Sequence, residues 1–181
     1  SVLAADEAEC TGGGGTVQMS IAAIPVIGNT ATSESLTTAW VQCPGDTDGD
    51  GQLSDAEQTA LGLPAGVKRV CKHLAASDGY IRLADNKELY AFGFSDVSGV
   101  APESAIKTGL LDSNFPAPTL AFDEGDEVFL TLTNVGMMKR PDLFDPHSVH
   151  FHGFPNAATV FDGVPESGVS VNMGSSLTYF Y

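Results

Sequence analysis

The chain has 181 residues, of which 23 are Asp or Glu and 8 are Lys or Arg, so its net charge is −15. That length suits one domain with at most a small appendage, and a hydrophobic content of 43% suffices for a folded core. Because so acidic a chain repels phosphate groups, we expect neither nucleic acid nor an anionic lipid surface as a partner. No apolar run approaches the ~20 residues of a membrane span. Metal cations are the ligands that this composition favours.

Residues 1–42 form a Gly-, Ser- and Thr-rich segment with a possible strand over residues 16–27. The run from Gly12 to Gly15 has no side chains to pack, so it predicts a flexible connector or a close backbone approach. The first ten residues contain no basic residue and no long apolar stretch. We interpret them as a mature N-terminus or as the trimmed edge of a longer chain.

Residues 43–79 are expected to hold a calcium loop and short helices. Residues 46–57 fit the twelve-position EF-hand loop, in which Gly51 permits the sharp turn at position 6. Pro44 directly before the loop precludes a continuous incoming helix, which favours a structural calcium site over a sensor. The expected calcium ligands are Asp46, Asp48, Asp50, Gln52 through its backbone carbonyl, Ser54 and Glu57.

Helical spacing of apolar residues predicts one short helix over residues 53–61 and a second that starts at residue 67 and closes near Gly79. Three cysteines permit one disulfide, either between Cys43 and Cys71, which bracket the loop, or between Cys10 and Cys43. Widely spaced cysteines, few lysines and a calcium-type loop together favour an extracellular, cell-surface or periplasmic protein.

Residues 80–181 have the sequence pattern of a β domain. Residues 127–134 alternate cleanly, with Val128, Leu130 and Leu132 on one face. Short strands separated by turn residues at this spacing indicate an antiparallel sandwich or barrel. The other expected strands lie at residues 80–83, 89–94, 119–122, 148–151, 159–161, 169–171 and 177–181, with a turn at residues 85–86.

Three of the four histidines lie close together, at His147, His150 and His152. On a strand, His150 and His152 would leave the same face about 7 Å apart, which suits two ligands of neighbouring metals in one cluster. His147 has the opposite parity, so its ring would point to the other face and serve a separate site.

These histidines stand in the setting DPHSVHFHGF…DGVPE…SLTYFY, which resembles the copper-binding strand of the multicopper oxidases and their cupredoxin domains. The upstream stretch NFPAPTLAFDEGDEVFLTLTN is similar to the opening of the first domain in that family. The resemblance covers roughly residues 80–181. A preceding calcium-loop region is not typical of the family, although it is similar to that of the larger bacterial surface oxidases linked to manganese or iron.

The resemblance implies copper as a cofactor and a cupredoxin-like Greek-key β-sandwich, here preceded by the small helical calcium-binding insert. Carried over residue by residue, it implies that His150 ligates a type 2 copper and His152 a type 3 copper. His147 stands where some domains of the family carry a type 1 copper ligand. A type 1 site also needs a Cys thiolate and usually a weak axial Met.

The chain departs from the family pattern at its C-terminal end. The family places a second His-x-His strand shortly after the region that matches residues 177–181, so the sandwich here is expected to lack its last strand or two. A trinuclear copper cluster also needs more histidines than the 4 present. We therefore expect the N-terminal part of a longer protein, completed by the rest of the polypeptide or by other chains, and not competent as an oxidase alone.

The expected organisation is thus an N-terminal segment (1–42), a calcium-loop region (43–79) and a partial cupredoxin domain (80–181). The function implied by the resemblance is oxidation of a small reducing substrate, a metal ion or a phenol, with reduction of O₂ to water. The alternative is a non-catalytic surface or filament building block completed by a neighbouring strand. A simple copper electron carrier is disfavoured, because Cys71 precedes the sandwich.

Overall fold

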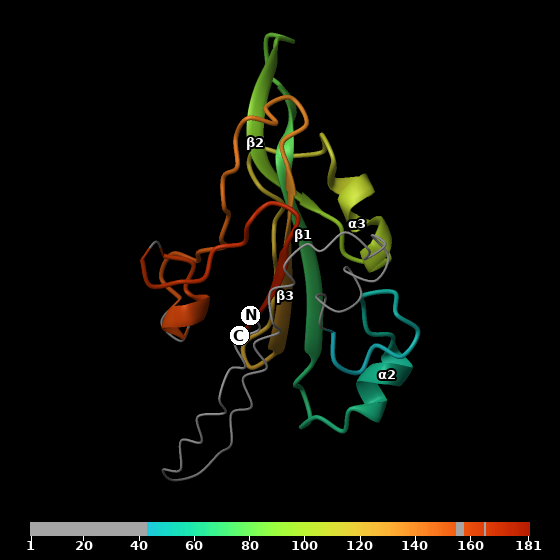
Figure 1. Ribbon diagram of the computed structural model, residues 1–181. Coiled ribbons are helices and arrows are strands. Elements are labelled where there is room, and N and C mark those ends of the chain that lie inside the picture. Colours follow the sequence, from blue (N-terminus) through green and yellow to red (C-terminus); the bar gives the residue numbers. More distant parts are fainter. Residues whose placement is uncertain (1–42, 155–157, 165) are drawn as a thin grey trace, which may run out of the picture.

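The computed structural model describes residues 43–154, 158–164 and 166–181, and the strand expected over residues 16–27 lies outside them. These residues form one four-stranded mixed sheet in the order β2-β1-β3-β4 (Figure 1). This mostly β architecture confirms the expected fold class, a fragment of a cupredoxin-like β-sandwich. The elements in chain order are α2 (Asp55–Ala60), β1 (Arg69–Arg82), β2 (Glu88–Asp96), α3 (Pro102–Gly109), β3 (Glu127–Gly136), the 3₁₀ helix η1 (Thr159–Phe161) and β4 (Ser176–Phe180).

Strand β3 is the strand whose alternating apolar residues the sequence showed most clearly. This strand runs parallel to β1 and antiparallel to β4, so both of its edges are paired. Strands β1 and β2 form the predicted antiparallel hairpin, and Asn86 takes a positive φ of 64° in its turn. The strands predicted at residues 127–134 and 177–181 are confirmed as β3 and β4.

The helix predicted from residue 67 to near Gly79 is wrong, because residues from Arg69 onward belong to β1. Strand β1 lies between β2 and β3 and is buried on both faces from His73 to Gly79. A strand buried on both faces shows no polar alternation, so its apolar residues can imitate helical spacing. Strand β1 also crosses the boundary expected at residue 80, and it carries Cys71, which forms a disulfide with Cys43.

Four further expected strands are not formed. Residues 119–122 and 148–151 have no ladder, residues 169–171 contribute a single bridge at Val171, and residues 159–161 form η1 instead of a strand. Helix α3 was not expected at all, although Pro102 stands at its first turn, where proline is favoured. Ala105 of α3 packs against Ala75 of β1 in a small second core.

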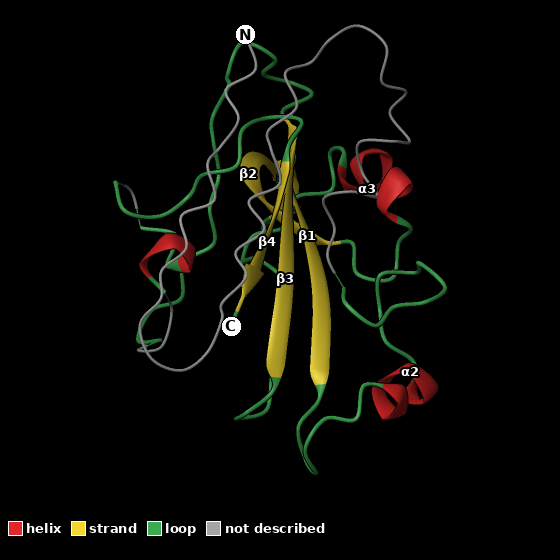
Figure 2. Ribbon diagram, turned by 60° about the horizontal axis from the view of Figure 1, so that its bottom comes forward, coloured by secondary structure: helices red, strands yellow, loops and turns green. Residues whose placement is uncertain are grey.

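The main core lies against β3 and β4. It includes Leu130, Leu132 and Tyr179, which are 0% exposed, and Val149 and Val171 from the irregular segments. Figures 1 and 2 both show α2 and α3 on one side of the sheet and the loops that carry η1 on the other. The core therefore holds the histidine-bearing segment against the sheet, although that segment is not a strand.

Among the described residues, the structure has no helix with the length and hydrophobicity of a membrane span.

Candidate metal centre

The histidine segment is held in place by a bridge and by side chains. His147 exchanges two backbone hydrogen bonds with Val171, at N···O distances of 3.0 and 2.7 Å. The amide of Asn134, which is 0% exposed, donates to the backbone carbonyls of Asp145 and Val171, each at 2.9 Å. Val149 then packs into the main core. The backbone on both sides of His147 is thus fixed to β3.

His150 and His152 lie together as predicted, with ring centroids 5.0 Å apart and planes at 62°. The two rings are closer than the spacing of a regular strand, because the segment does not follow strand geometry. Both residues are exposed. Among the described residues, no further His, Cys or carboxylate joins this pair in a cluster of three ligand groups. The pair is therefore an incomplete ligand set that offers two imidazoles to a shared site.

The proton of the His150 ring is assigned by its hydrogen bond. Its Nδ1 lies 2.6 Å from the backbone carbonyl oxygen of Asp162 and 3.5 Å from a carboxylate oxygen of the same residue. A carbonyl oxygen only accepts, so Nδ1 carries a proton, and Nε2 is the ring nitrogen that can ligate a metal. A neutral imidazole whose second nitrogen is held by a carbonyl is the arrangement that orients a ligating histidine. His150 therefore fits a copper ion through Nε2.

His147 lies apart from this pair. Its ring is half-buried and contacts Phe94 of β2, with centroids 6.4 Å apart. Burial lowers the pKa of His147, and the negative charge of Asp145 opposes that shift. The ring is neutral at pH 7, as a metal ligand must be. Within the described residues, no Cys or other metal ligand gathers around it.

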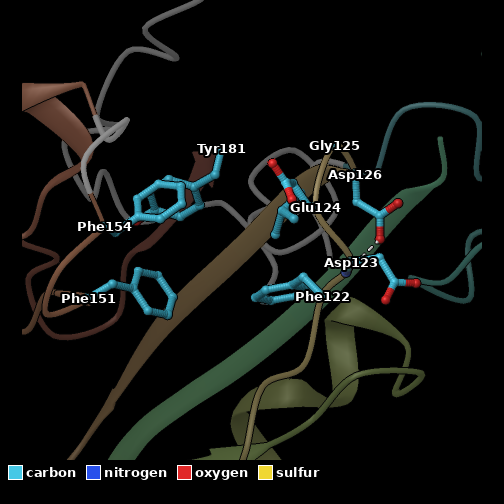
Figure 3. Close-up of a pocket in the computed structure, with 9 residues that line it drawn as sticks. Phe122, Asp123, Glu124, Gly125, Asp126, Phe151, Phe154 and Tyr181 are labelled. Atoms are coloured by element: carbon cyan, nitrogen blue, oxygen red, sulfur yellow. Dashed lines mark hydrogen bonds between the residues drawn. The ribbon is translucent and has the colours of Figure 1, made fainter.

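The residue between the paired histidines lines a cavity of about 340 Å³. Figure 3 shows Phe151 facing Phe122 across this space, with Phe154 and Tyr181 beside them. Phe151 packs edge-on against Tyr181 at 5.4 Å. These aromatic contacts hold the middle of the histidine segment while the imidazoles remain exposed. The rest of the lining is Asp123, Glu124, Gly125, Asp126 and Val128.

The predicted calcium loop brings part of its ligand set together. Carboxylate oxygens of Asp46, Asp48 and Asp50 lie within 4.8 Å of one another. Backbone amides of the loop orient them, because Asp46 accepts from the amides of Gly49 at 2.7 Å and Gly51 at 2.8 Å. The repulsion between the three carboxylates is what a cation would relieve.

The remaining predicted ligands lie around this group. Glu57 accepts from the backbone amide of Thr47 at 2.6 Å and from the hydroxyl of Ser54 at 2.8 Å, so it is not part of the carboxylate cluster. The hydrogen bonds from Thr47 are the main reason that the pKa of Glu57 is lowered to about 2. Ser54 caps α2. Gln52 is exposed, and its side chain lies over Gly99.

The described residues thus present two neighbouring imidazoles, those of His150 and His152, beside a mostly β fold. Residues 99–181 match the model of the multicopper oxidase family, so this part of the chain is similar to a family whose cofactor is copper. A comparison with curated proteins finds no match. The matched region contains His147, His150, His152 and the whole of β3 and β4.

Several residues that shape this centre were not identified from the sequence as site residues. Asp162 entered the sequence analysis only as the first residue of the DGVPE stretch, yet its carbonyl oxygen lies 2.6 Å from Nδ1 of His150. Tyr179 of β4 and Tyr181, the residue directly after β4, contact the same region. Strand parity places both tyrosines on one face. Their targets are backbone atoms of distant loops, for which no sequence signal exists.

Proposed function

We propose that the chain is the N-terminal part of a copper-dependent oxidase, in which His150 and His152 hold type 2 and type 3 copper and His147 is a candidate type 1 ligand. The observation that carries the proposal is the 5.0 Å pairing of two imidazoles inside the region that matches the family. Bound copper would supply one-electron transfer from the substrate and the reduction of O₂ to water. The chain itself would orient the imidazoles.

The remaining copper ligands would come from the rest of the polypeptide or from other chains, because the pair alone is an incomplete set. A metal ion such as Mn²⁺ or Fe²⁺, or a phenol, would serve as the reducing substrate, and the net charge of −15 favours a cation. The disulfide between Cys43 and Cys71 supports an extracellular, cell-surface or periplasmic location, where such bonds persist.

Copper titration of the metal-free full chain, followed by EPR, tests the proposal. We expect nitrogen-coordinated copper, and we expect His150→Ala or His152→Ala to weaken binding by more than about 100-fold, because even outer-shell changes cost about 10–100-fold. His73→Gln is the matched control, since His73 is buried and hydrogen-bonded to Thr133. Unchanged affinity in either pair variant would reject copper at this pair and favour the non-catalytic building block.

We also propose that residues 46–57 bind one structural Ca²⁺ through Asp46, Asp48, Asp50, the carbonyl of Gln52, Ser54 and Glu57. The 4.8 Å cluster of three carboxylates supports this site. Ligation by Glu57 would require its carboxylate to leave Thr47 and turn toward the cluster. The disulfide and the hydrogen bonds between Gln58 and Arg69 would then couple the ion to β1.

Removal of Ca²⁺ should therefore lower the thermal stability of the chain. At a free Ca²⁺ concentration about 100 times the dissociation constant, binding contributes about 2.7 kcal/mol to the free energy of unfolding. That corresponds to a loss of roughly 5–10 °C in Tm on addition of a chelator, measured by circular dichroism. Asp46→Asn should abolish the response, whereas Asp112→Asn, an exposed site outside the loop, should keep it. An equal response of both variants would contradict the assignment.

A further inference from the structure

We propose that the hydroxyl groups of Tyr179 and Tyr181 position the imidazole of His150, so that Nδ1 stays protonated and Nε2 is presented to the metal. The inference deepens the copper function proposed above and rests on it for the identity of the metal. The orientation itself is a property of the metal-free chain.

Tyr179 holds the backbone immediately before His150. Its hydroxyl oxygen accepts a hydrogen bond from the amide of Val149 at 3.3 Å, and the side chain is 0% exposed. In a regular strand a neighbouring carbonyl would take this amide. A side chain of β4 therefore replaces the missing ladder partner at the point where the histidine segment leaves the core.

Tyr181 holds the residue immediately before the proton acceptor of His150. Its hydroxyl donates to the carbonyl oxygen of Phe161 at 2.8 Å, and the next residue, Asp162, accepts the Nδ1 proton. The backbone of Tyr181 is itself fixed, since its amide and carbonyl bond to Val128 at 3.0 and 2.9 Å. The acceptor loop is thus tied to the same strand as the histidine segment.

The two tyrosines work as one unit because they are neighbours on one face. Their rings lie parallel within 4°, with centroids 6.1 Å apart. Tyr179 pairs with Leu130 in the middle of the sheet, so the unit stands on a rigid base. Residues two apart on a strand point the same way, which sends both hydroxyls toward the loops around His150.

A third contact joins the histidine segment directly to the loop that carries Asp162. The hydroxyl of Ser148 donates to the carbonyl of Gly163 at 2.8 Å, and any Cβ at Gly163 would collide with the carbonyl oxygen of Val149. The histidine segment and the acceptor loop therefore touch directly, and both are also anchored on β4. Loss of either phenol would let them slide apart and lengthen the bond from Nδ1 to Asp162.

Nitrogen-15 NMR of the metal-free full chain, at a pH above about 8 where ordinary imidazoles are neutral, measures the tautomer directly. We expect His150 to be mainly the Nδ1-protonated form in the parent chain. Tyr181→Phe, Tyr179→Phe and the double variant should each reduce that fraction. Copper affinity should fall about 10-fold in Tyr181→Phe, as for other changes in the outer shell of a metal.

Tyr90→Phe is the matched control, because it removes a phenol that donates to Asp78 at 2.7 Å rather than to the His150 region. The ring of His73, hydrogen-bonded to Thr133, serves as an internal reference whose tautomer stays constant. If the buried Tyr179 variant fails to fold, Tyr181→Phe and Ser148→Ala carry the test, since both residues are only partly buried.

An unchanged His150 tautomer in Tyr181→Phe and Ser148→Ala would overturn the proposal, as would a parent chain in which Nδ1 is unprotonated. A tautomer that shifts in the variants of a chain that binds no copper would support the positioning role and reject the copper function. The two proposals can therefore fail separately.

Discussion

Replacement of Cys43 and Cys71 by alanine should lower the free energy of unfolding by about 3–4 kcal/mol. The disulfide joins residues 28 apart, and closing a loop of that length removes this much conformational freedom from the unfolded chain. Urea unfolding followed by circular dichroism measures the difference. We expect a lower midpoint and a larger dependence on urea, because the unbridged chain exposes more surface when it unfolds.

Cys10→Ala provides the control for this prediction and removes the thiol that could form the competing bond with Cys43. On that background the parent disulfide should retain its full effect, and reduction with a thiol reagent should reproduce the double alanine variant. A midpoint that does not move on reduction would mean that the loop region contributes nothing to the stability of β1.

Strand β1, which carries one cysteine of this disulfide, shows why part of the fold could not be predicted from the sequence. Apolar spacing at Val67, Val70 and Leu74 imitates a helix, and only pairing with β2 and β3 makes residues 69–82 a strand. That pairing depends on residues 88–96 and 127–136, which no local window contains. Strand β3 was predictable because alternating residues of its sequence carry the core, with Leu130 and Leu132 at 0% exposure.

The candidate metal centre was likewise predictable only in part. The spacing of His150 and His152 predicted a shared side, and the rings lie 5.0 Å apart, although the backbone is not a regular strand. The period of two residues therefore predicted correctly that His150 and His152 are neighbours, although it assumed a strand that the segment does not form. The contacts of the proton acceptor Asp162 and of the phenols of Tyr179 and Tyr181 depend on loop positions that packing sets, so they could be identified only from the structure.

The free energy of unfolding should fall by about 3 kcal/mol as the pH decreases from about 6.5 to about 4, because of His73 alone. His73 is 4% exposed, and its Nε2 lies 2.7 Å from the hydroxyl of Thr133. Burial lowers the pKa of His73 to about 4, against a smaller opposing effect of Asp96. In this pH range His73 binds a proton in the unfolded chain but not in the folded chain. The unfolded state is therefore favoured as the pH falls.

His73→Gln should remove this slope, because glutamine stays neutral and can still hydrogen-bond to Thr133. The measurement belongs in a His147→Gln background, since burial also lowers the pKa of His147 and gives a slope of the same sign. Glu57 acts mainly below this range: its pKa is lowered from 4.5 to about 2, so its contribution is lost progressively as the pH falls between these two values. An equal pH dependence between pH 6.5 and 4 in the His147→Gln chain and in the double variant would show that the buried ring of His73 is not its source.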